Sequence, residues 1–524
     1  MLVGSYNPFD QLTISALISA IPILLFLICL TVLKMKGITT ALLNLVVTFL
    51  LAFFIFDLSF GNSFGSVVQG IIQGIVPIGF IIVMAVWLYK ISVNSGKFDV
   101  LRSSIAGISH DQRIQLLLIG FCFNAFLEGA AGFGVPIAIC AVLLMSLGFG
   151  PLQAAMLCLI ANGASGAFGA IGIPVGIIDS FNLEGGISSV DVSKMSALTL
   201  PFINMTIPFL MIWLIDGFKG IKETMPAILV TGLTYAISQI IFTVFIGPEL
   251  ADIVPPILAM GALVLLCRKW EPKKLFFLAG HDLEYEKNTV WDIIKAWSPF
   301  YLLTFFILIW SLPSFKNLFA EGGILNFSVI QFTIPFSEIP ISLDIVSATG
   351  TAIFIAAIVT ILTTHHINFS TSGQLLGDAL KEFWIPIIMI CAIIGIAKLM
   401  TYGGMTMALG EAVAKTGSAF PFLSPILGWI GVFMTGSVVN NNTLFSPIQA
   451  SAGNMMATNS TLLVSANTVG GVMAKLVSPQ SIAIATAAVG ERGKEAELTK
   501  LTLKYSLGLL VFVCIWTFIL SFIV

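Results

Sequence analysis

The chain has 524 residues, of which 57% are hydrophobic and 10% are charged, and its formal net charge is −2. This composition is that of a polytopic membrane protein and excludes a soluble globular domain. A net charge near zero, with no long acidic or basic tail, argues against a nucleic-acid partner.

Residues 1–65 contain two apolar runs, 12–33 and 39–58, each long enough for a spanning helix of about 17–25 residues. We expect them to be scaffold helices 1 and 2. The short loop between them carries Lys34 and Lys36. Because positively charged loops stay in the cytoplasm, this pattern places the N-terminus outside.

Residues 66–195 are expected to form the first of two inverted repeats, which begins with a span over 66–93. The next apolar stretch is too short to cross a bilayer comfortably, and after a glycine-rich break Pro136 opens another short stretch. This pattern predicts a re-entrant hairpin over 113–148. The following run, 152–180, is interrupted by glycines and a proline and predicts a broken helix.

The tip of this hairpin carries one acid, Glu128, in the stretch Asn124-Ala-Phe-Leu-Glu-Gly-Ala-Ala-Gly-Phe-Gly-Val-Pro136. A carboxylate at membrane depth costs about 2.5–3.5 kcal/mol, so it usually faces a cavity or a partner. Irregular backbone is tolerated there only when it is buried in protein or lines water. We therefore expect a solute site at Glu128. A kinked spanning helix with a structural glutamate is the alternative.

Residues 196–375 are expected to be scaffold helices separated by loops. The predicted helices are 196–216, 226–247, 252–268, 293–313 and 344–364. The charged stretch 269–292 is predicted to be a cytoplasmic loop, and no fold is predicted for 314–343. The pair His365-His366 is interpreted as part of a solvated loop rather than as a metal or pH-sensing site.

Residues 376–491 are expected to form the second inverted repeat, with the same order of elements as the first. It contains a predicted hairpin over 422–457 and a predicted broken helix over 461–489. Residues 492–524 form the last predicted helix. With both hairpins re-entrant, the chain has about 12 transmembrane helices and its basic loops fall on one side of the membrane.

Glycine, proline and asparagine recur at matched spacing in the two repeats. The matched pairs are Pro77 and Pro386, Gly120 and Gly431, Pro136 and Pro447, Asn162 and Asn467, and Pro174 and Pro479. The predicted topology places the first hairpin inside and the second outside, so the repeats are inverted. Inverted repeats whose discontinuous helices meet near the midplane are typical of secondary transporters.

Broken helices present free backbone N–H groups, whose partial positive charge favours an anionic solute, in particular a carboxylate. Neutral donors gather at the same breaks, and interhelical hydrogen bonding is the alternative interpretation of them. The candidate substrate-binding residues of this kind are Asn162, Ser165, Asn441, Asn442, Thr443, Asn467 and Thr468.

Two charged residues complete the predicted site. Lys475 lies inside the second broken helix and is expected to bind the solute carboxylate or to neutralise Glu128; a purely structural counter-ion is the alternative. Glu128 is the candidate proton carrier, because the proton affinity of a carboxyl group depends on whether apolar groups or a cation face it. Lys398, near the end of its span, is expected to snorkel to the membrane surface. The seven cysteines show no metal-binding spacing, and neither a metal nor a cofactor is predicted.

The sequence resembles the bacterial L-lactate permease family over essentially the whole chain. Most of the resemblance lies in the stretch from Asn124 to Ala138. Three further stretches add to it: Ala161-Asn-Gly-Ala-Ser-Gly166, Ser437-Val-Val-Asn-Asn-Asn-Thr-Leu-Phe445 and Ala466-Asn-Thr-Val-Gly-Gly471. The resemblance implies uptake of L-lactate, and often of glycolate or D-lactate, with protons across the bacterial cytoplasmic membrane.

The family is similar to the ion-transporter superfamily, whose members pair two hairpins with two broken helices. This likeness implies an all-α integral membrane protein of the elevator type, and many members are homodimers in which a transport domain moves past a scaffold. In sodium-coupled members, Ser-Asn-Thr-type tips contact sodium and carboxylate. Here the second tip reads Asn441-Asn442-Thr443, but the first carries Glu128, which favours protons over sodium.

The sequence therefore predicts a proton-coupled monocarboxylate symporter in the lipid bilayer, with no cofactor, no nucleic-acid partner and no enzymatic activity. Sodium-coupled organic-anion symport is the first alternative. An integral membrane enzyme is less favoured, because no histidines, cysteines or paired carboxylates cluster at membrane depth. A channel is less favoured as well, because two occluding hairpins suggest alternating access.

Overall fold

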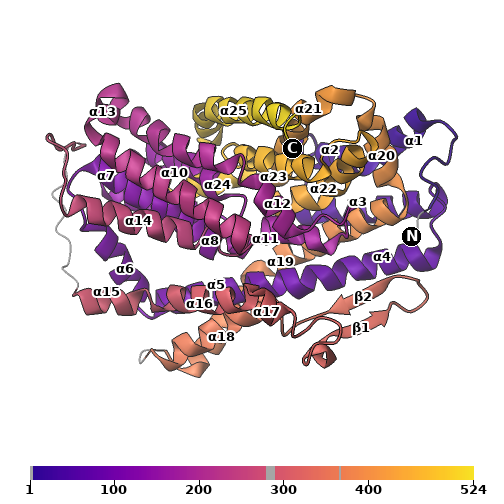
Figure 1. Cartoon of the computed structure of the whole chain (residues 1–524), viewed down its shortest axis with the longest axis horizontal. Helices are drawn as coiled ribbons and strands as arrows, with labels where there is room; N and C mark the ends of the chain where they lie inside the picture. The colour runs from indigo at the N-terminus through magenta and orange to yellow at the C-terminus, as the bar shows by residue number, and fades with distance from the viewer. Residues whose placement is uncertain (1–3, 279–288, 365–366) are drawn as a thin grey trace.

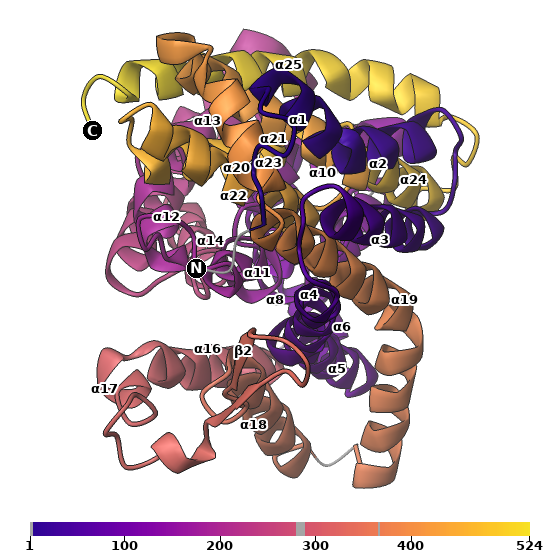
Figure 2. The same cartoon turned by 90° about the vertical axis from the view of Figure 1, so that its right-hand side faces the viewer.

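The computed structural model describes residues 4–278, 289–364 and 367–524. The chain is mostly helical, and the prediction of a helical membrane protein is confirmed (Figure 1). In Figure 2, α16 (Ser298–Ser311), α17 (Pro313–Lys316), α18 (Thr349–Leu362) and β2 (Pro340–Leu343) lie in the lower part of the view, and the long helix α19 (Phe369–Tyr402) extends into this part from the centre. The prediction for His365-His366 lies outside the described residues, as does part of the predicted loop 269–292.

The N-terminal helices precede the first hairpin. They are α1 (Leu12–Ser19), α2 (Ile21–Thr31), α3 (Gly37–Phe54), α4 (Phe60–Gln73), the π-helix η1 (Gly74–Gly79), α5 (Phe80–Asn94) and α6 (Lys97–Ala106). The predicted span 66–93 is thus a kinked helix in which Pro77, lacking an N–H, interrupts the α-helical hydrogen bonds.

The first hairpin has two arms that pack against each other. The entering arm is α7 (Gln112–Gln115), η2 (Leu116–Phe123) and α8 (Asn124–Ala130), and the returning arm is α9 (Val135–Ser146). Gly132 and Gly134 adopt positive φ in the turn between the arms, a conformation that glycine adopts without strain. The entering arm is buried along its whole length, so it lies inside the protein rather than against lipid.

The first broken helix follows directly. It consists of α10 (Pro151–Ser165), α11 (Gly169–Gly176) and the 3₁₀-helix η3 (Ile177–Ser180), with a bend of 51° at the break. Ala170, Ile171 and Gly172 all have positive φ, so the backbone there does not have the conformation of a right-handed α-helix. Such a break requires a buried or polar setting at membrane depth.

The middle of the chain holds further helices, several of which pack against the first hairpin, and two strands. They are α12 (Ser189–Ser196), α13 (Leu200–Phe245), α14 (Val254–Cys267), α15 (Val290–Ala296), α16 (Ser298–Ser311), α17 (Pro313–Lys316), η4 (Asn326–Ser328), β1 (Ile330–Thr333), β2 (Pro340–Leu343) and α18 (Thr349–Leu362). The two predicted helices 196–216 and 226–247 are the two arms of α13, which is kinked at Gly217. In the segment 314–343, for which no fold was predicted, β1 and β2 pair antiparallel with Ile330 opposite Leu343.

The C-terminal elements repeat the hairpin and the break. They are α19, α20 (Met405–Ala414), η5 (Gly417–Ala419), α21 (Phe420–Thr435), α22 (Val438–Met455), α23 (Ser460–Ala474), α24 (Pro479–Ala488) and α25 (Glu495–Leu520). The second hairpin is formed by α21 and α22, which turn at Gly436, and the second broken helix by α23 and α24. The predicted tip Asn440–Thr443 instead forms the first turns of α22.

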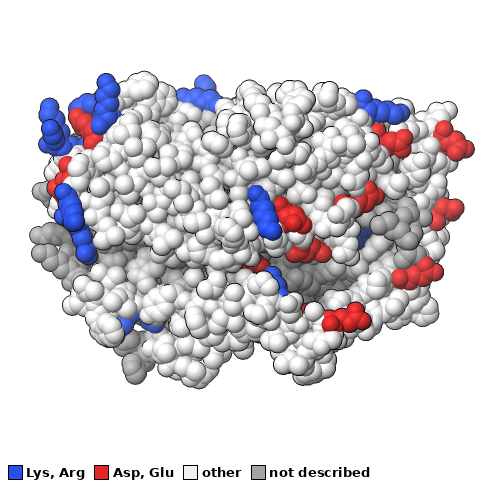
Figure 3. All heavy atoms as spheres, viewed as in Figure 1, with Lys and Arg blue, Asp and Glu red and all other residues white. Residues whose placement is uncertain are grey.

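Nine helices in the described chain are long and apolar enough to cross a membrane, or up to eleven if each bent pair is one span. Both entering arms of the hairpins are among the nine, so length alone does not separate a crossing from a re-entrant arm. The count of about 12 spans, the re-entrant topology and the division into scaffold and repeats therefore stay predictions. The face drawn in Figure 3 is largely uncharged, as expected for apolar helices that face lipid.

Lys398 of α19 does not snorkel, and that prediction was wrong. The residue is only 2% exposed. Its ammonium group donates to the backbone carbonyl of Ser180 and lies 5.2 Å from the centre of the Phe181 ring. The end of the first broken helix covers this lysine, a contact between segments far apart in the sequence.

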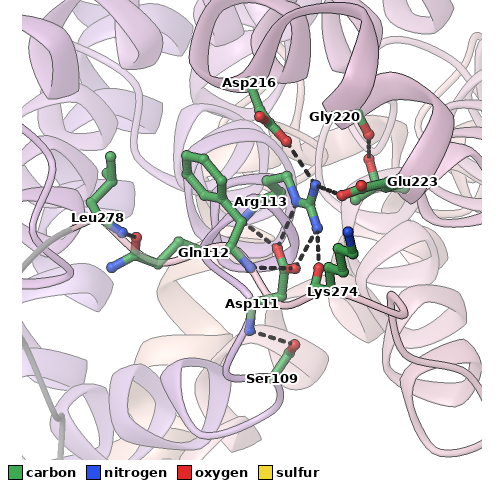
Figure 4. A network of polar contacts seen from close by, with 11 residues as sticks. Ser109, Asp111, Gln112, Arg113, Asp216, Gly220, Glu223, Lys274 and Leu278 are labelled. Carbon is green, nitrogen blue, oxygen red and sulfur yellow. Dashed lines mark hydrogen bonds and ion pairs between the residues drawn. The ribbon is translucent and has the colours of Figure 1, made fainter.

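A buried arginine anchors the base of the first hairpin (Figure 4). Arg113 of α7 donates to Asp111 at 2.8 Å and to both Asp216 and Glu223 of α13 at 2.7 Å. It also donates to the backbone carbonyl of Lys274 at 2.8 Å. One guanidinium group thus ties the hairpin to the kinked part of α13 and to the segment after α14, which fixes the direction in which the hairpin enters.

Candidate functional site

The centre of the site is an ion pair between the two predicted repeats. The ammonium nitrogen of Lys475, just after α23, lies 2.5 Å from Oε1 of Glu128 in α8. The Glu128 side chain is 3% exposed and that of Lys475 is 13% exposed. An ion pair shielded from water in this way is much stronger than a surface pair, and each partner depends on the other.

The first broken helix holds the other side of the Glu128 carboxylate. The side-chain amide of Asn162 in α10 donates to Oε2 at 2.9 Å. Gly169, at the start of α11, touches the same carboxylate, since a Cβ at this position would lie 2.5 Å from Oε1. The Ser165 hydroxyl is buried near this break and has no hydrogen-bond partner among the described residues. The break therefore fits closely around Glu128 and orients it toward Lys475.

A cavity of about 70 Å³ lies beside the ion pair. Its walls come from both hairpin turns, through Gly132 to Gly134 and Gly436 to Val439, and from both helix breaks. Glu128 and Lys475 are the charged residues among its described lining, so the net charge of the lining is zero. The volume suffices for a few water molecules or a small solute.

The lining of the cavity includes both polar and apolar residues. Apart from the ion pair, its polar lining residues are Ser437, Gln480 and Ser481. Its apolar lining residues include Phe133, Ile137, Val438, Val439 and Ile484. Such an arrangement suits a small molecule that has one charged group, a hydrogen-bonding group and a short apolar part.

The predicted asparagines and threonines of the second repeat form a cluster next to this cavity but do not line it. Asn442 is the hub: its amide donates to the Pro174 carbonyl at 2.7 Å, and its oxygen accepts from Asn467 at 3.0 Å and from Thr468 at 3.1 Å. Asn441 donates to the Asn467 backbone carbonyl at 3.3 Å. The Thr443 hydroxyl bonds within its own helix, to Val439.

The structure thus divides the predicted site residues into two groups. Glu128 and Lys475 line the cavity, with Asn162 directly behind Glu128. The cluster around Asn442 joins α22 and α23 to α11, which is the interhelical role considered as the alternative. The oxygens of Asn441 and Asn467 are buried without a partner among the described residues, so this cluster retains unused acceptors.

Sequence reasoning missed the serines and the glutamine that line the cavity. Ser437 caps α22 by accepting the Asn440 N–H, and Ser481 lies in the first turn of α24. Both follow a break, so the helix N-terminus itself was the available signal. Gln480 was missed because its orientation depends on how α24 is rotated about its axis, which the break leaves undetermined.

Asp252 is a second buried acid close to the first hairpin. Its Oδ1 accepts from Tyr235 at 2.9 Å and from Gln239 at 2.8 Å. The Asp252 backbone carbonyl packs on Gly129, where a Cβ would lie 2.0 Å away. The acid therefore supports the helix that carries Glu128 and does not itself line the cavity.

No set of three or more histidine, cysteine, aspartate or glutamate side chains in the described parts of the chain could hold a metal ion. The cysteines are unpaired thiols, and all but the partly buried Cys267 are buried. What the site offers is one buried ion pair beside a small cavity that has both polar and apolar lining residues.

The chain is similar to known proteins along nearly its whole length. The model of the L-lactate permease family matches residues 15–524. Over 521 residues the chain is 69% identical to the L-lactate permease of Halalkalibacterium halodurans, with 99% of each chain covered. It is 40% identical over 534 residues to glycolate permease GlcA of Escherichia coli, with 96% of this chain and 95% of that protein covered.

A solved structure of Neisseria gonorrhoeae MtrF, from a class of antimetabolite efflux pumps, is more distant. Its TM-score is 0.47 at 13% identity, and the match covers 87% of this chain and 83% of that chain. A likeness of this size carries no argument about the present protein.

Proposed function

The chain belongs to the L-lactate permease family, and from this premise we propose that it takes up L-lactate by proton symport across the bacterial cytoplasmic membrane. Glycolate and D-lactate are further proposed substrates, and glycolate is supported by the similarity to a glycolate permease. The relatives are permeases, so the protein is a transporter, and no enzymatic step is proposed.

The observation that carries the proposal is the ion pair of Glu128 and Lys475 beside the central cavity. In the empty site each charge neutralises the other. A solute carboxylate that binds Lys475 without any other change would leave two carboxylates facing one ammonium group in a largely buried site. Such a state is strongly disfavoured, because like charges shielded from bulk water repel and a buried charge needs a partner.

A proton removes this conflict. When a proton binds Glu128, the carboxyl group becomes neutral and Lys475 is free to pair with the solute carboxylate. The occupied site then has the same net charge as the empty one, since one anion and one proton have entered together. Asn162 holds Oε2 of Glu128 from behind, so the carboxyl group stays in place while its charge changes.

The remaining groups of the cavity fit a short 2-hydroxy acid. Ser437, Gln480 and Ser481 offer hydrogen bonds to a hydroxyl group, while Ile137 and Ile484 contact a methyl group. We also propose that the cluster around Asn442 takes part in substrate binding. The side-chain oxygens of Asn441 and Asn467, which have no partner among the described residues, would accept hydrogen bonds from the solute. Elevator movement and a homodimer are part of the same proposal and rest on the family likeness.

The test is uptake of labelled L-lactate into sodium-free proteoliposomes with an imposed inward proton gradient. We expect accumulation that a protonophore abolishes. Glu128→Gln should lose this accumulation by about 100-fold or more but retain exchange of labelled for unlabelled lactate, because the neutral amide leaves Lys475 free. Glu321→Gln, which changes an exposed acid, is the matched control and should behave like the parent protein.

Two results would contradict the proposal. Gradient-driven accumulation that survives in Glu128→Gln would exclude Glu128 as the coupling group. Uptake that requires sodium and ignores the proton gradient would favour the sodium-coupled organic-anion symporter.

A further inference from the structure

A second, larger cavity lies beside the second hairpin. Its volume is about 810 Å³. It is bounded by the loop between α2 and α3, by α19 around Pro386, and by the turn between α21 and α22. Gly436 and Gln480 line both this cavity and the central one, so the turn of the second hairpin separates the two spaces.

Most of the wall of this larger cavity is apolar. Phe26 and Leu30 of α2, Met389 of α19, and Phe433 and Met434 of α21 contribute to it. A hydrophilic monocarboxylate would gain little from these side chains, whereas an acyl chain would bury its surface against them. The lining therefore favours an amphiphile over the transported solute.

The charges at this cavity are all positive. Lys34 and Lys36 are the charged residues among its described lining, and neither forms an ion pair with another described residue. Both side chains are exposed. Two cations that form no ion pair with an acid attract an anionic group, and both ammonium groups are available to contact it.

The two lysines also lie at the right depth for a lipid headgroup. Their loop connects two apolar helices of spanning length, Leu12–Leu30 and Gly37–Phe54. It must therefore lie near a membrane surface, while the apolar wall extends from it toward the membrane interior. Basic pockets between transmembrane helices that combine these two features bind anionic lipid headgroups.

We propose that this cavity binds one anionic phospholipid, with its phosphate at Lys34 and Lys36 and an acyl chain along Leu30, Met389 and Phe433. The bound lipid would also contact the turn of the second hairpin. Gly436 has positive φ in that turn, and a Cβ there would lie 2.3 Å from the Gln480 side chain, so the turn is tightly fitted between the two cavities. Occupancy by the lipid stabilises this turn and thereby raises the rate of transport.

Binding is tested first, and independently of any transported solute. The protein is purified in detergent, mixed with phosphatidylglycerol or phosphatidylcholine, and analysed by native mass spectrometry. We expect retention of one phosphatidylglycerol and at least a tenfold loss of the bound fraction in Lys34→Gln/Lys36→Gln. The control Lys500→Gln/Lys504→Gln removes two exposed cations of α25 and should retain the lipid.

The position of the acyl chain in the proposed lipid site is tested by filling the cavity with a larger side chain. Met389→Trp adds bulk inside the apolar wall while both lysines stay in place, and we expect it to lose phosphatidylglycerol as well. Its thermal unfolding is measured alongside, and Met389→Phe, which adds less bulk, is the second filling variant if the tryptophan protein does not fold. Phosphatidylglycerol retained by a folded Met389→Trp protein would overturn the assignment of the cavity.

The effect on transport is tested with lactate exchange in vesicles of phosphatidylcholine with and without phosphatidylglycerol. We expect phosphatidylglycerol to stimulate the parent protein several-fold and to leave Lys34→Gln/Lys36→Gln unchanged. If the double variant instead binds lipid normally and exchanges slowly in both kinds of vesicle, the lysines serve the path of the solute and the lipid proposal is wrong. Failure of the lipid experiment does not affect the proton-symport test, which uses a fixed lipid composition.

Discussion

The side-chain amide of Asn442 donates to the backbone carbonyl of Pro174 at 2.7 Å, across 268 positions of the sequence. This bond joins the second hairpin to the break of the first broken helix. The same side chain also accepts from Asn467 in the second broken helix. A single asparagine therefore holds three of the four elements whose ends meet at the cavity.

Replacing this asparagine should loosen the site and the fold together. In Asn442→Ala, the Pro174 carbonyl loses its donor and the Asn467 amide loses its acceptor, and each buried group left unsatisfied costs about 1–3 kcal/mol. We expect a lower temperature of thermal unfolding in detergent and little lactate uptake. Asn454→Ala, on the exposed end of the same helix, should unfold like the parent. An Asn442→Ala protein as stable as Asn454→Ala would show that the bonds are dispensable.

We predict that substitutions of Glu128 and Lys475 have strongly coupled effects on the free energy of unfolding. Lys475→Met leaves the buried Glu128 carboxylate without its cation, and breaking a buried pair in this way costs about 3–5 kcal/mol. Glu128→Gln leaves the ammonium without its anion. The double variant Glu128→Gln/Lys475→Met has neither buried charge, so it should be less destabilised than the sum of the single variants. A double-mutant cycle of unfolding free energies measures the coupling, and additive effects would exclude it.

We predict that Gly169 is required because it has no side chain, and not because of its backbone conformation. A Cβ at this position would lie 2.5 Å from Oε1 of Glu128, so Gly169→Ala should push the carboxylate away from Lys475. We expect proton-driven lactate uptake to fall by about tenfold or more. A tenfold fall corresponds to about 1.4 kcal/mol of interaction free energy lost when the ion pair is misplaced. Gly176→Ala in the same broken helix is the control, because a Cβ there meets no atom within 4 Å. Equal uptake by the two variants would rule out this steric role.

A separate prediction concerns Arg113 and its ion pairs at the base of the first hairpin. Arg113→Gln removes the cation that forms ion pairs with Asp111, Asp216 and Glu223, of which Asp111 is fully buried. We expect a loss of about 3–5 kcal/mol in unfolding free energy. Arg492→Gln, an exposed arginine, should cost less than about 1 kcal/mol. Comparable stability of the two variants in chemical unfolding would contradict the anchoring role.

The sequence pattern indicates many of the helix ends, because glycine and proline interrupt apolar runs where a helix cannot continue, but it placed the second turn at Asn440–Thr443 instead of Gly436. It also selects Glu128 and Lys475, since a charge at membrane depth needs a partner. The pattern does not reveal which side of a short half-helix faces the cavity, so Ser437 and Gln480 escaped notice. The pattern also does not show that a segment of the first repeat covers Lys398, so the burial of this lysine was not predicted. Both failures concern contacts between segments far apart along the chain.

The last prediction concerns pH and Glu249, which lies in the turn between α13 and α14. Its side chain is 18% exposed and 3.8 Å from Lys316. Burial raises the pKa of Glu249 above its ordinary value of 4.5, and the nearby Asp179 adds to this, although Lys316 opposes it. The folded protein therefore binds this proton more tightly than the unfolded chain. As pH rises from 4.5 through the folded pKa, stability is lost and stays lost at neutral pH.

Glu249→Gln removes this titration. We expect the variant to unfold at a higher temperature than the parent at neutral pH, with the difference shrinking as pH falls below 4.5, where both the folded and the unfolded parent carry the proton. The lost contact with Lys316 opposes the gain only slightly, because the lysine is half exposed and such pairs contribute about 0–1 kcal/mol. Glu321→Gln, an exposed acid, controls for the change in net charge. A Glu249→Gln protein whose stability difference from the parent is independent of pH, or grows on acidification, would show that the carboxyl group titrates alike in the folded and unfolded chain.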